Sequence, residues 1–223
     1  MAYSAVPIVA TGDLWTASNH NTYIRDNFAA GVPDIFATKG DLAVASAANA
    51  AVRLAAGANG ELLLADSAQS GGMKWIGLSE MTYPARAYLS AVQGIASSTL
   101  TIVAWDAESY DPTGVFTLGA NAKYIAPVTG YYLVTLGLHY LSGNWQIGNV
   151  AEGRIYKNGV HYSTPAVFLP NVNASLGIAI RGSDIVQLNI SQYIDIRAWQ
   201  TAGSQINLGT AGLSTFVSIA RVG

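Results

Sequence analysis

The stretch Tyr124–Leu141, YIAPVTGYYLVTLGLHYL, decides the fold. A turn at Pro127–Gly130 opens it, and the residues that follow alternate between two kinds of position. Even positions from Tyr132 to Tyr140 are all apolar or aromatic, whereas odd positions are mixed. This period of two predicts a strand with one face in a core and the other against less apolar surroundings. Because so long a strand needs partners on both sides, we expect it to be the central strand of a β-sandwich.

The chain from Tyr83 onward has an all-β texture, in which short apolar segments are separated by Gly, Pro, Asn and Asp turns. Asn158-Gly159 is the strongest two-residue hairpin signal, and Arg181–Asp184 predicts a second turn. We expect a jelly-roll sandwich over residues 83–223. Its predicted strands cover residues 85–92, 99–105, 115–118, 131–141, 153–157, 160–162, 175–180, 185–190 and 215–222.

Residues 1–80 differ in texture and are predicted to form a separate arm. A short helix is expected at about residues 18–30, begun by Ser18 or Asn19 and ended by Gly31 and Pro33. It is too short to be stable alone and must dock through its apolar side. The candidate anchor residues are Trp15, Tyr23, Ile24 and Phe28.

Very short apolar segments separated by turn residues follow this helix, within residues 39–76. Strands of this length do not form a free-standing sheet, so the winding of several chains around an axis would complete them. The alternative is a flexible Ala/Gly linker.

The composition excludes several classes of protein. Charged residues make up only 11% of the chain, against roughly 25% in ordinary globular proteins, and mean hydropathy is +0.29. This favours association with other chains over the alternative of a monomer with a polar Ser/Thr/Asn surface. No Lys/Arg cluster indicates nucleic-acid binding, no apolar run is long enough to span a membrane, and there is no cysteine for disulfides. The first residues lack the features of a secretory signal.

Residues 83–223 resemble the trimeric jelly roll shared by the complement globular head and tumour necrosis factor. The resemblance implies a homotrimer that binds partners and is not an enzyme. The matching pieces, in family order, are Trp105-Asp106, Tyr110-Asp111, Gly114 with Phe116-Thr117, Tyr124–Tyr132, Lys157-Asn158-Gly159, Gly182–Val186 and Thr215-Phe216.

Residues 14–75 resemble the anchor or shaft portions of tailed-phage virion proteins, which implies attachment to other virion proteins, in the capsid or the tail, through residues 1–80. The stretches that match are Trp15–Asn27, Lys39–Leu42, Arg53-Leu54, Gly57–Gly60, Leu63–Ser67 and Lys74-Trp75. A collagen-like Gly-X-Y stalk, found in the animal complement relatives, is missing.

The trimer gives the mixed face of the central strand a role. Tyr131, Thr135, Gly137 and His139 are the candidate interface residues; the alternative is that this face meets the edge of the second layer. His139 could titrate at a trimer axis or be an ordinary packed or exposed histidine.

Asp106, Glu108 and Asp111 are the candidate calcium ligands, because they place three carboxylates on one loop and some relatives bind calcium. Their spacing matches no calcium-loop pattern, and Asp111 before Pro112 is also an ordinary turn residue. We therefore expect no metal and no cofactor.

Three aromatic residues in polar stretches, Trp145, Tyr193 and Trp199, are candidate contacts for a glycan or a protein partner. The alternative is that they cover the ends of the sandwich or pack at the trimer seam.

These observations predict a non-enzymatic structural protein of a tailed-phage virion, assembled in the host cytoplasm. It would bind the host surface as a short fibre or spike, or decorate the capsid. The alternative is a bacterial extracellular module that binds a glycan or protein. No catalytic motif is present, and the paired carboxylates of a glycan hydrolase are not evident.

Overall fold

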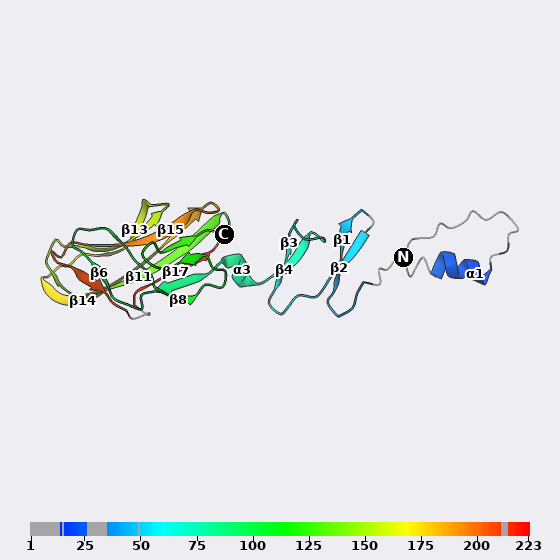
Figure 1. Cartoon of the computed structure of the whole chain (residues 1–223), viewed down its shortest axis with the longest axis horizontal. Helices are drawn as coiled ribbons and strands as arrows, with labels where there is room; N and C mark the ends of the chain where they lie inside the picture. The colour runs from blue at the N-terminus through cyan, green and yellow to red at the C-terminus, as the bar shows by residue number, and fades with distance from the viewer. Residues whose placement is uncertain (1–13, 15, 26–34, 49, 211–213) are drawn as a thin grey trace. The chain divides into compact units, whose positions relative to one another are not determined.

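A computed structural model describes residues 14, 16–25, 35–48, 50–210 and 214–223 (Figure 1). The chain divides into two units, Met1–Leu78 and Ser79–Gly223. A short helix, α3 (Leu78–Thr82), lies at the division.

The second unit is a sandwich of two antiparallel sheets, visible as two layers of strands in Figure 1. The six-stranded sheet contains, in order, β13 (Val160–Phe168), β12 (Ala151–Lys157), β15 (Tyr193–Gln200), β10 (Lys123–Ile125) and β9 (Phe116–Thr117), with β7 (Thr101–Ile102) paired to β15. The seven-stranded sheet contains β6 (Gln93–Ile95), β16 (Ile206–Leu208), β11 (Gly130–Trp145), β17 (Phe216–Arg221), β5 (Ala85–Tyr88) and β8 (Ala107–Tyr110), with β14 (Ala174–Leu188) paired to β11. The predicted all-β jelly-roll sandwich is confirmed.

Strand β11 is the central strand, as its alternation predicts. It pairs with β14 along nearly its whole length, and with β17 and β16. Its even positions are all buried in the core between the sheets: Tyr132, Val134, Leu136, Leu138 and Tyr140. Burying this apolar face is the main contribution of β11 to stability, at about 25 cal/mol for each Å² removed from water.

The predicted turn at Arg181–Asp184 is wrong, because β14 continues through it. Gly182 lies opposite Leu136 and Ser183 opposite Thr135 in the β11 ladder. A Cβ atom on Gly182 would collide with the backbone of Pro165 in the other sheet. The glycine therefore permits a close approach between the sheets, and pairing with the long strand β11 overrides the local turn preference.

The Asn158-Gly159 hairpin is confirmed. Both residues have positive φ, 49° and 77°, as a tight turn between paired strands requires. Asp106 shortens the first predicted strand, because its carboxylate accepts hydrogen bonds from the backbone N–H groups of Ser90 and Ala91 just beyond β5.

The first unit begins with a helical segment shorter than the predicted one. A four-residue helix, α1 (Ala17–His20), continues as a π-helical turn over Asn21–Arg25. Thr16, not Ser18 or Asn19, caps it, because the Thr16 hydroxyl accepts the N–H of Asn19. The predicted helix end, with Gly31 and Pro33, lies outside the described residues.

Two hairpins follow, β1 (Leu42–Ala47) with β2 (Ala50–Leu54), and β3 (Leu62–Ala65) with β4 (Met73–Ile76). Asp41 fixes the first hairpin, since its carboxylate accepts hydrogen bonds from Arg53 and from the backbone N–H groups of Ala37, Thr38 and Ala56. The Arg53 guanidinium holds the pKa of Asp41 far below its usual range.

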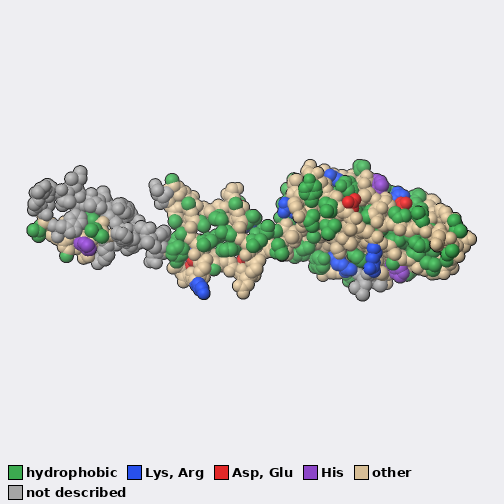
Figure 2. Space-filling view, turned by 180° about the vertical axis from the view of Figure 1, so that it is seen from behind, with side chains coloured by type: hydrophobic (Ala, Val, Ile, Leu, Met, Phe, Trp, Pro, Cys, Tyr) green, Lys and Arg blue, Asp and Glu red, His purple; other side chains and the backbone are tan. Residues whose placement is uncertain are grey.

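The hairpins have almost no core of their own. Ile76 is the only hydrophobic residue of the described part of this unit that is buried, and Leu62, Leu63 and Leu64 are exposed. Figure 2 shows hydrophobic side chains gathered over this hairpin region. In the described residues, no helix is long and apolar enough to cross a membrane.

Candidate functional site

The outward side of the seven-stranded sheet, called here the β11 face, exposes apolar side chains. Leu133 on β11 and Ile185 on β14 lie directly opposite each other and are 39% and 50% exposed. Tyr131 is 51% exposed beside them, and Val222 lies just beyond β17. A contiguous apolar area on a sheet surface is typical of an interaction site.

The predicted interface residues lie on the β11 face, but they are not equally accessible. Tyr131 is exposed and Thr135 half-buried. Gly137 is buried beneath Phe216, because a Cβ atom there would lie 2.8 Å from the Phe216 ring. His139 is half-buried, with its Nδ1 atom 3.4 Å from the Ser214 hydroxyl. At the position of Gly137, the surface is therefore formed by Phe216.

The outward side of the six-stranded sheet, called here the β15 face, presents ion pairs and aromatic rings on β12 and β15 and exposed apolar side chains, such as Val167, on β13. Strand β15 was not predicted, because its outward residues resemble those of a polar loop. The signal was nonetheless present: Ile194, Ile196 and Ala198 point into the core. They alternate with the outward residues Tyr193, Asp195, Arg197 and Trp199.

Charged groups on the β15 face are paired locally. Arg197 donates from Nε to Asp195 Oδ1 at 2.6 Å, and its guanidinium lies 3.9 Å from the centre of the Tyr156 ring. The hydrogen bond to Asp195 raises the pKa of Arg197. Arg154 pairs with Glu152 in the same way and lies over Trp199.

These ion pairs also offset the repulsion between two neighbouring arginines. Arg154 and Arg197 lie directly opposite each other in the ladder, where like charges repel. Each arginine has a carboxylate two residues away on the same side of its own strand, which offsets that repulsion.

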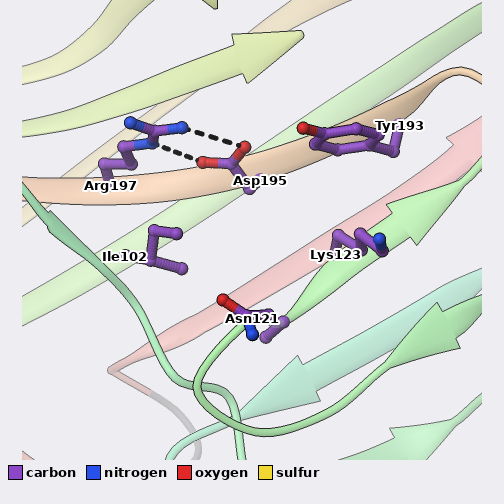
Figure 3. A pocket seen from close by; sticks show the side chains of 7 residues that line it. Ile102, Asn121, Lys123, Tyr193, Asp195 and Arg197 are labelled. Atoms are coloured by element: carbon purple, nitrogen blue, oxygen red, sulfur yellow. Dashed lines mark hydrogen bonds and ion pairs between the residues drawn. The ribbon is translucent and has the colours of Figure 1, made fainter. Parts of the chain in front are cut away.

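A pocket opens on this face, with a cavity of about 180 Å³ (Figure 3). Strands β7 and β10 pair with the same edge of β15 at two places, Ile102 opposite Arg197 and Tyr124 opposite Ile194. The pocket lies where one strand gives way to the other. Its lining residues are Ile102, Asn121, Ala122, Lys123, Tyr193, Asp195 and Arg197.

The hairpin turn holds Tyr193 in place at the pocket. The Asn158 side chain accepts the N–H of Tyr193, and the N–H of Asn158 donates to the Tyr193 carbonyl. Lys123 Nζ lies 5.0 Å from the centre of the Tyr193 ring. Sequence reasoning singled out Tyr193 but missed Asn121, Lys123 and Arg197, because only the pairing of β10 with β15 brings them together.

The interpretation of Trp145 as a surface contact is wrong. Trp145 ends β11 and is fully buried, with its indole N–H donating to the Leu176 carbonyl. Its ring packs edge-on against Tyr140 and Phe168. The polar residues around it misled the prediction, because β11 extends beyond Leu141 after a register shift between Tyr140 and Gly143.

The candidate calcium ligands are engaged in turns. Asp106 accepts three hydrogen bonds from Ser90 and Ala91, and Asp111 accepts the N–H groups of Val115 and Phe116. Partial burial, with a smaller effect from Asp111, raises the pKa of Glu108. The described residues contain no group of three or more side chains placed to hold a metal ion.

Two of the four candidate anchor residues, Trp15 and Phe28, lie outside the described residues. Tyr23 is half-buried and Ile24 is 40% exposed on the π-helical turn. The structure leaves their proposed role in attachment as a prediction.

No protein-family model and no curated protein sequence matches this chain. Among solved structures, it is similar to murine APRIL, with 12% identity over 63% of this chain and 99% of that one, and a TM-score of 0.47. It is also similar to Eiger TNF from S. frugiperda, with 11% identity over 64% of this chain and 93% of that one, and a TM-score of 0.47. The globular domain of zebrafish complement 1qA protein has 11% identity over 61% of this chain and 92% of that one, with a TM-score of 0.41. At this identity the likeness concerns the fold alone.

Proposed function

We propose that this chain is a non-enzymatic structural protein of a tailed-phage virion that acts as a homotrimer. Residues 1–78 attach it to the particle and start the trimer. The sandwich binds the host surface, as a short fibre or spike, or decorates the capsid.

The single observation that best supports the trimer is the β11 face. Leu133, Ile185 and Tyr131 form an exposed apolar surface on the longest strand pair of the molecule. Charged residues are only 11% of the chain, so few charges on its surface oppose association with other chains. Two further copies of the same chain would cover this face with a surface of matching character.

The first unit supports the same proposal independently. An isolated two-stranded hairpin is marginally stable. Among the described residues, the first hairpin has no buried hydrophobic residue and the second has one, Ile76. The exposed Leu62–Leu64 edge offers apolar surface that identical hairpins of neighbouring chains would bury. The attachment to a virion rests on the resemblance of residues 14–75 to phage anchor and shaft segments.

Light scattering on the intact chain tests the oligomeric state. The expected mass is three times the 23.3 kDa of one chain. A monomer at micromolar concentration would overturn the trimer.

Imaging of purified particles that carry a labelled copy tests the location. The label is expected at regular positions on the capsid or tail, and a chain without residues 1–78 is expected to be missing from the particles. A full-length chain that never co-purifies with particles would contradict the virion assignment.

A further inference from the structure

The pocket on the β15 face contains polar groups that no neighbour uses. Within the described part of the chain, the Lys123 ammonium has no carboxylate partner and lies 5.0 Å from the centre of the Tyr193 ring. The Asn121 side chain lines the same pocket and makes no hydrogen bond with any of the described residues. An anion can therefore pair with Lys123 without displacing an existing interaction, and the Asn121 amide can both donate and accept.

Asp195 restricts which anion fits. Its carboxylate lines the pocket beside Arg197, which occupies one hydrogen-bonding position on each of its oxygens. The Asp195 side chain is only 5% exposed, and the part of its carboxylate that borders the pocket favours a hydroxyl donor and repels a compact, fully anionic ligand such as phosphate. The ligand must therefore present hydroxyl donors toward Asp195 and a negative charge toward Lys123.

The remaining walls and the size define the ligand further. Ile102 and the Tyr193 ring provide apolar surface, which suits the C–H faces of a sugar ring. The cavity of about 180 Å³ is smaller than the roughly 300–1,000 Å³ of sites for drug-sized ligands. One ring with its substituents matches it.

We propose that this pocket binds a single acidic sugar residue, a pyranose with one carboxylate, exposed on a surface glycan. Lys123 pairs with the carboxylate, Asp195 and Asn121 bind ring hydroxyls, and Ile102 and Tyr193 contact the ring. The surface-glycan context rests on the host-binding role proposed above, whereas the ligand chemistry follows from the pocket.

The test measures binding of glucuronate to the intact chain by ligand-observed NMR and calorimetry, beside glucose, succinate and phosphate. A single sugar is expected to bind with a dissociation constant in the millimolar range. Glucuronate should bind about tenfold more tightly than glucose, because only glucuronate forms the charge-assisted bond to Lys123. N-acetylneuraminate is measured as a second acidic sugar.

Matched variants assign any binding to the pocket. Lys123→Gln should weaken glucuronate binding about tenfold and leave glucose unchanged. Lys157→Gln makes the same charge change on β12, where the ammonium donates to the Gln187 carbonyl, and should have no effect. Asn121→Ala, at an exposed position, should weaken both sugars and provides a test if Lys123→Gln folds poorly.

Three results would overturn the proposal: no binding of either acidic sugar at up to roughly 50 mM, equal binding of glucuronate and succinate, or unchanged binding in both pocket variants. Equal binding of succinate would indicate an acidic peptide or generic carboxylate site. Light scattering on the same samples separates the two proposals, since a trimer that ignores acidic sugars contradicts only the pocket, and a monomer that binds them contradicts only the trimer.

Discussion

The outward faces of the two sheets differ although their inward faces are alike. Both sheets contribute fully buried aliphatic residues to one core, Leu136 and Val217 from one side and Ile155 and Ala198 from the other. Outward, the β11 face exposes Leu133 and Ile185, whereas the β15 face has ion pairs stacked on aromatic rings. The inward residues determine the fold, and the outward residues determine which partners or ligands each face can bind.

The two faces also differ in how far their outward side chains find partners within a single chain. On the β15 face, Arg154 and Arg197 each have a carboxylate and a ring as neighbours. On the β11 face, the apolar pair Leu133 and Ile185 remains exposed. The arginines of the β15 face are therefore paired within one chain, whereas the apolar surface of the β11 face is removed from water only when another surface covers it.

The largest expected effect on stability comes from a substitution in the core between the two sheets. Leu136→Ala should lower the free energy of unfolding by about 2–5 kcal/mol, because the side chain is fully buried and its loss leaves a cavity. Val167→Ala on β13, at a residue 48% exposed, should cost less than about 1 kcal/mol. Denaturant unfolding at one fixed protein concentration measures both, and equal effects would contradict the assignment of Leu136 to the core.

A second prediction concerns the β11 face alone. Leu133→Asp combined with Ile185→Asp should convert the proposed trimer to monomer and raise its dissociation constant at least 100-fold, because two carboxylates would be buried at an apolar interface. Light scattering over a concentration series measures this.

The matched control for that prediction is Val167→Asp, which places a carboxylate on an exposed apolar position of the other sheet. Val167→Asp should leave the proposed trimer intact. Gly137 is a poorer test site, because any side chain there would press on Phe216 within the same chain. Dissociation by Val167→Asp, with none by the double variant, would place the interface on the six-stranded sheet.

The sequence predicted the core-facing residues of the strands better than the surface-facing ones. The alternation from Tyr132 to Tyr140 is strict, since every even residue must be apolar to remain in the core. The turn predicted at Arg181–Asp184 failed because pairing with β11 and the close approach to Pro165 outweighed local preference. Both are long-range contacts that a local pattern does not contain.

The candidate site was predicted only in part, for the same reason. Tyr193 and Trp199 were identified by their polar neighbours, and both lie on the β15 face. The same argument misplaced Trp145, since polar residues also flank a buried strand end. Lys123 lies 70 residues before Tyr193, and only the β10–β15 ladder makes them neighbours.

A third prediction compares a polar group on each face. Asp195→Asn should lower stability by about 2 kcal/mol, because Arg197 would lose its charged partner while remaining only about one-fifth exposed. Ser183→Ala on the β11 face should change stability by no more than about 0.5 kcal/mol, since that side chain is exposed. Thermal unfolding of both variants measures the difference, and equal values would show that the ion pair is not structurally important.

The smallest expected effect is a difference in salt dependence between ligand binding on the β15 face and association through the β11 face. Attraction between Lys123 and a sugar carboxylate is electrostatic and acts at a partly exposed site, so ions screen it. Raising the salt concentration from about 0.05 M to 0.5 M should weaken glucuronate binding a few-fold and leave glucose binding unchanged. The proposed association through Leu133 and Ile185 is apolar, so the proposed trimer should persist or tighten slightly under the same change. Calorimetry and light scattering on one preparation measure the two responses together. Dissociation of the trimer in salt, with constant glucuronate binding, would reverse the roles given to the two faces. The contact between the chains would then be electrostatic, and the contact with the ligand would be apolar.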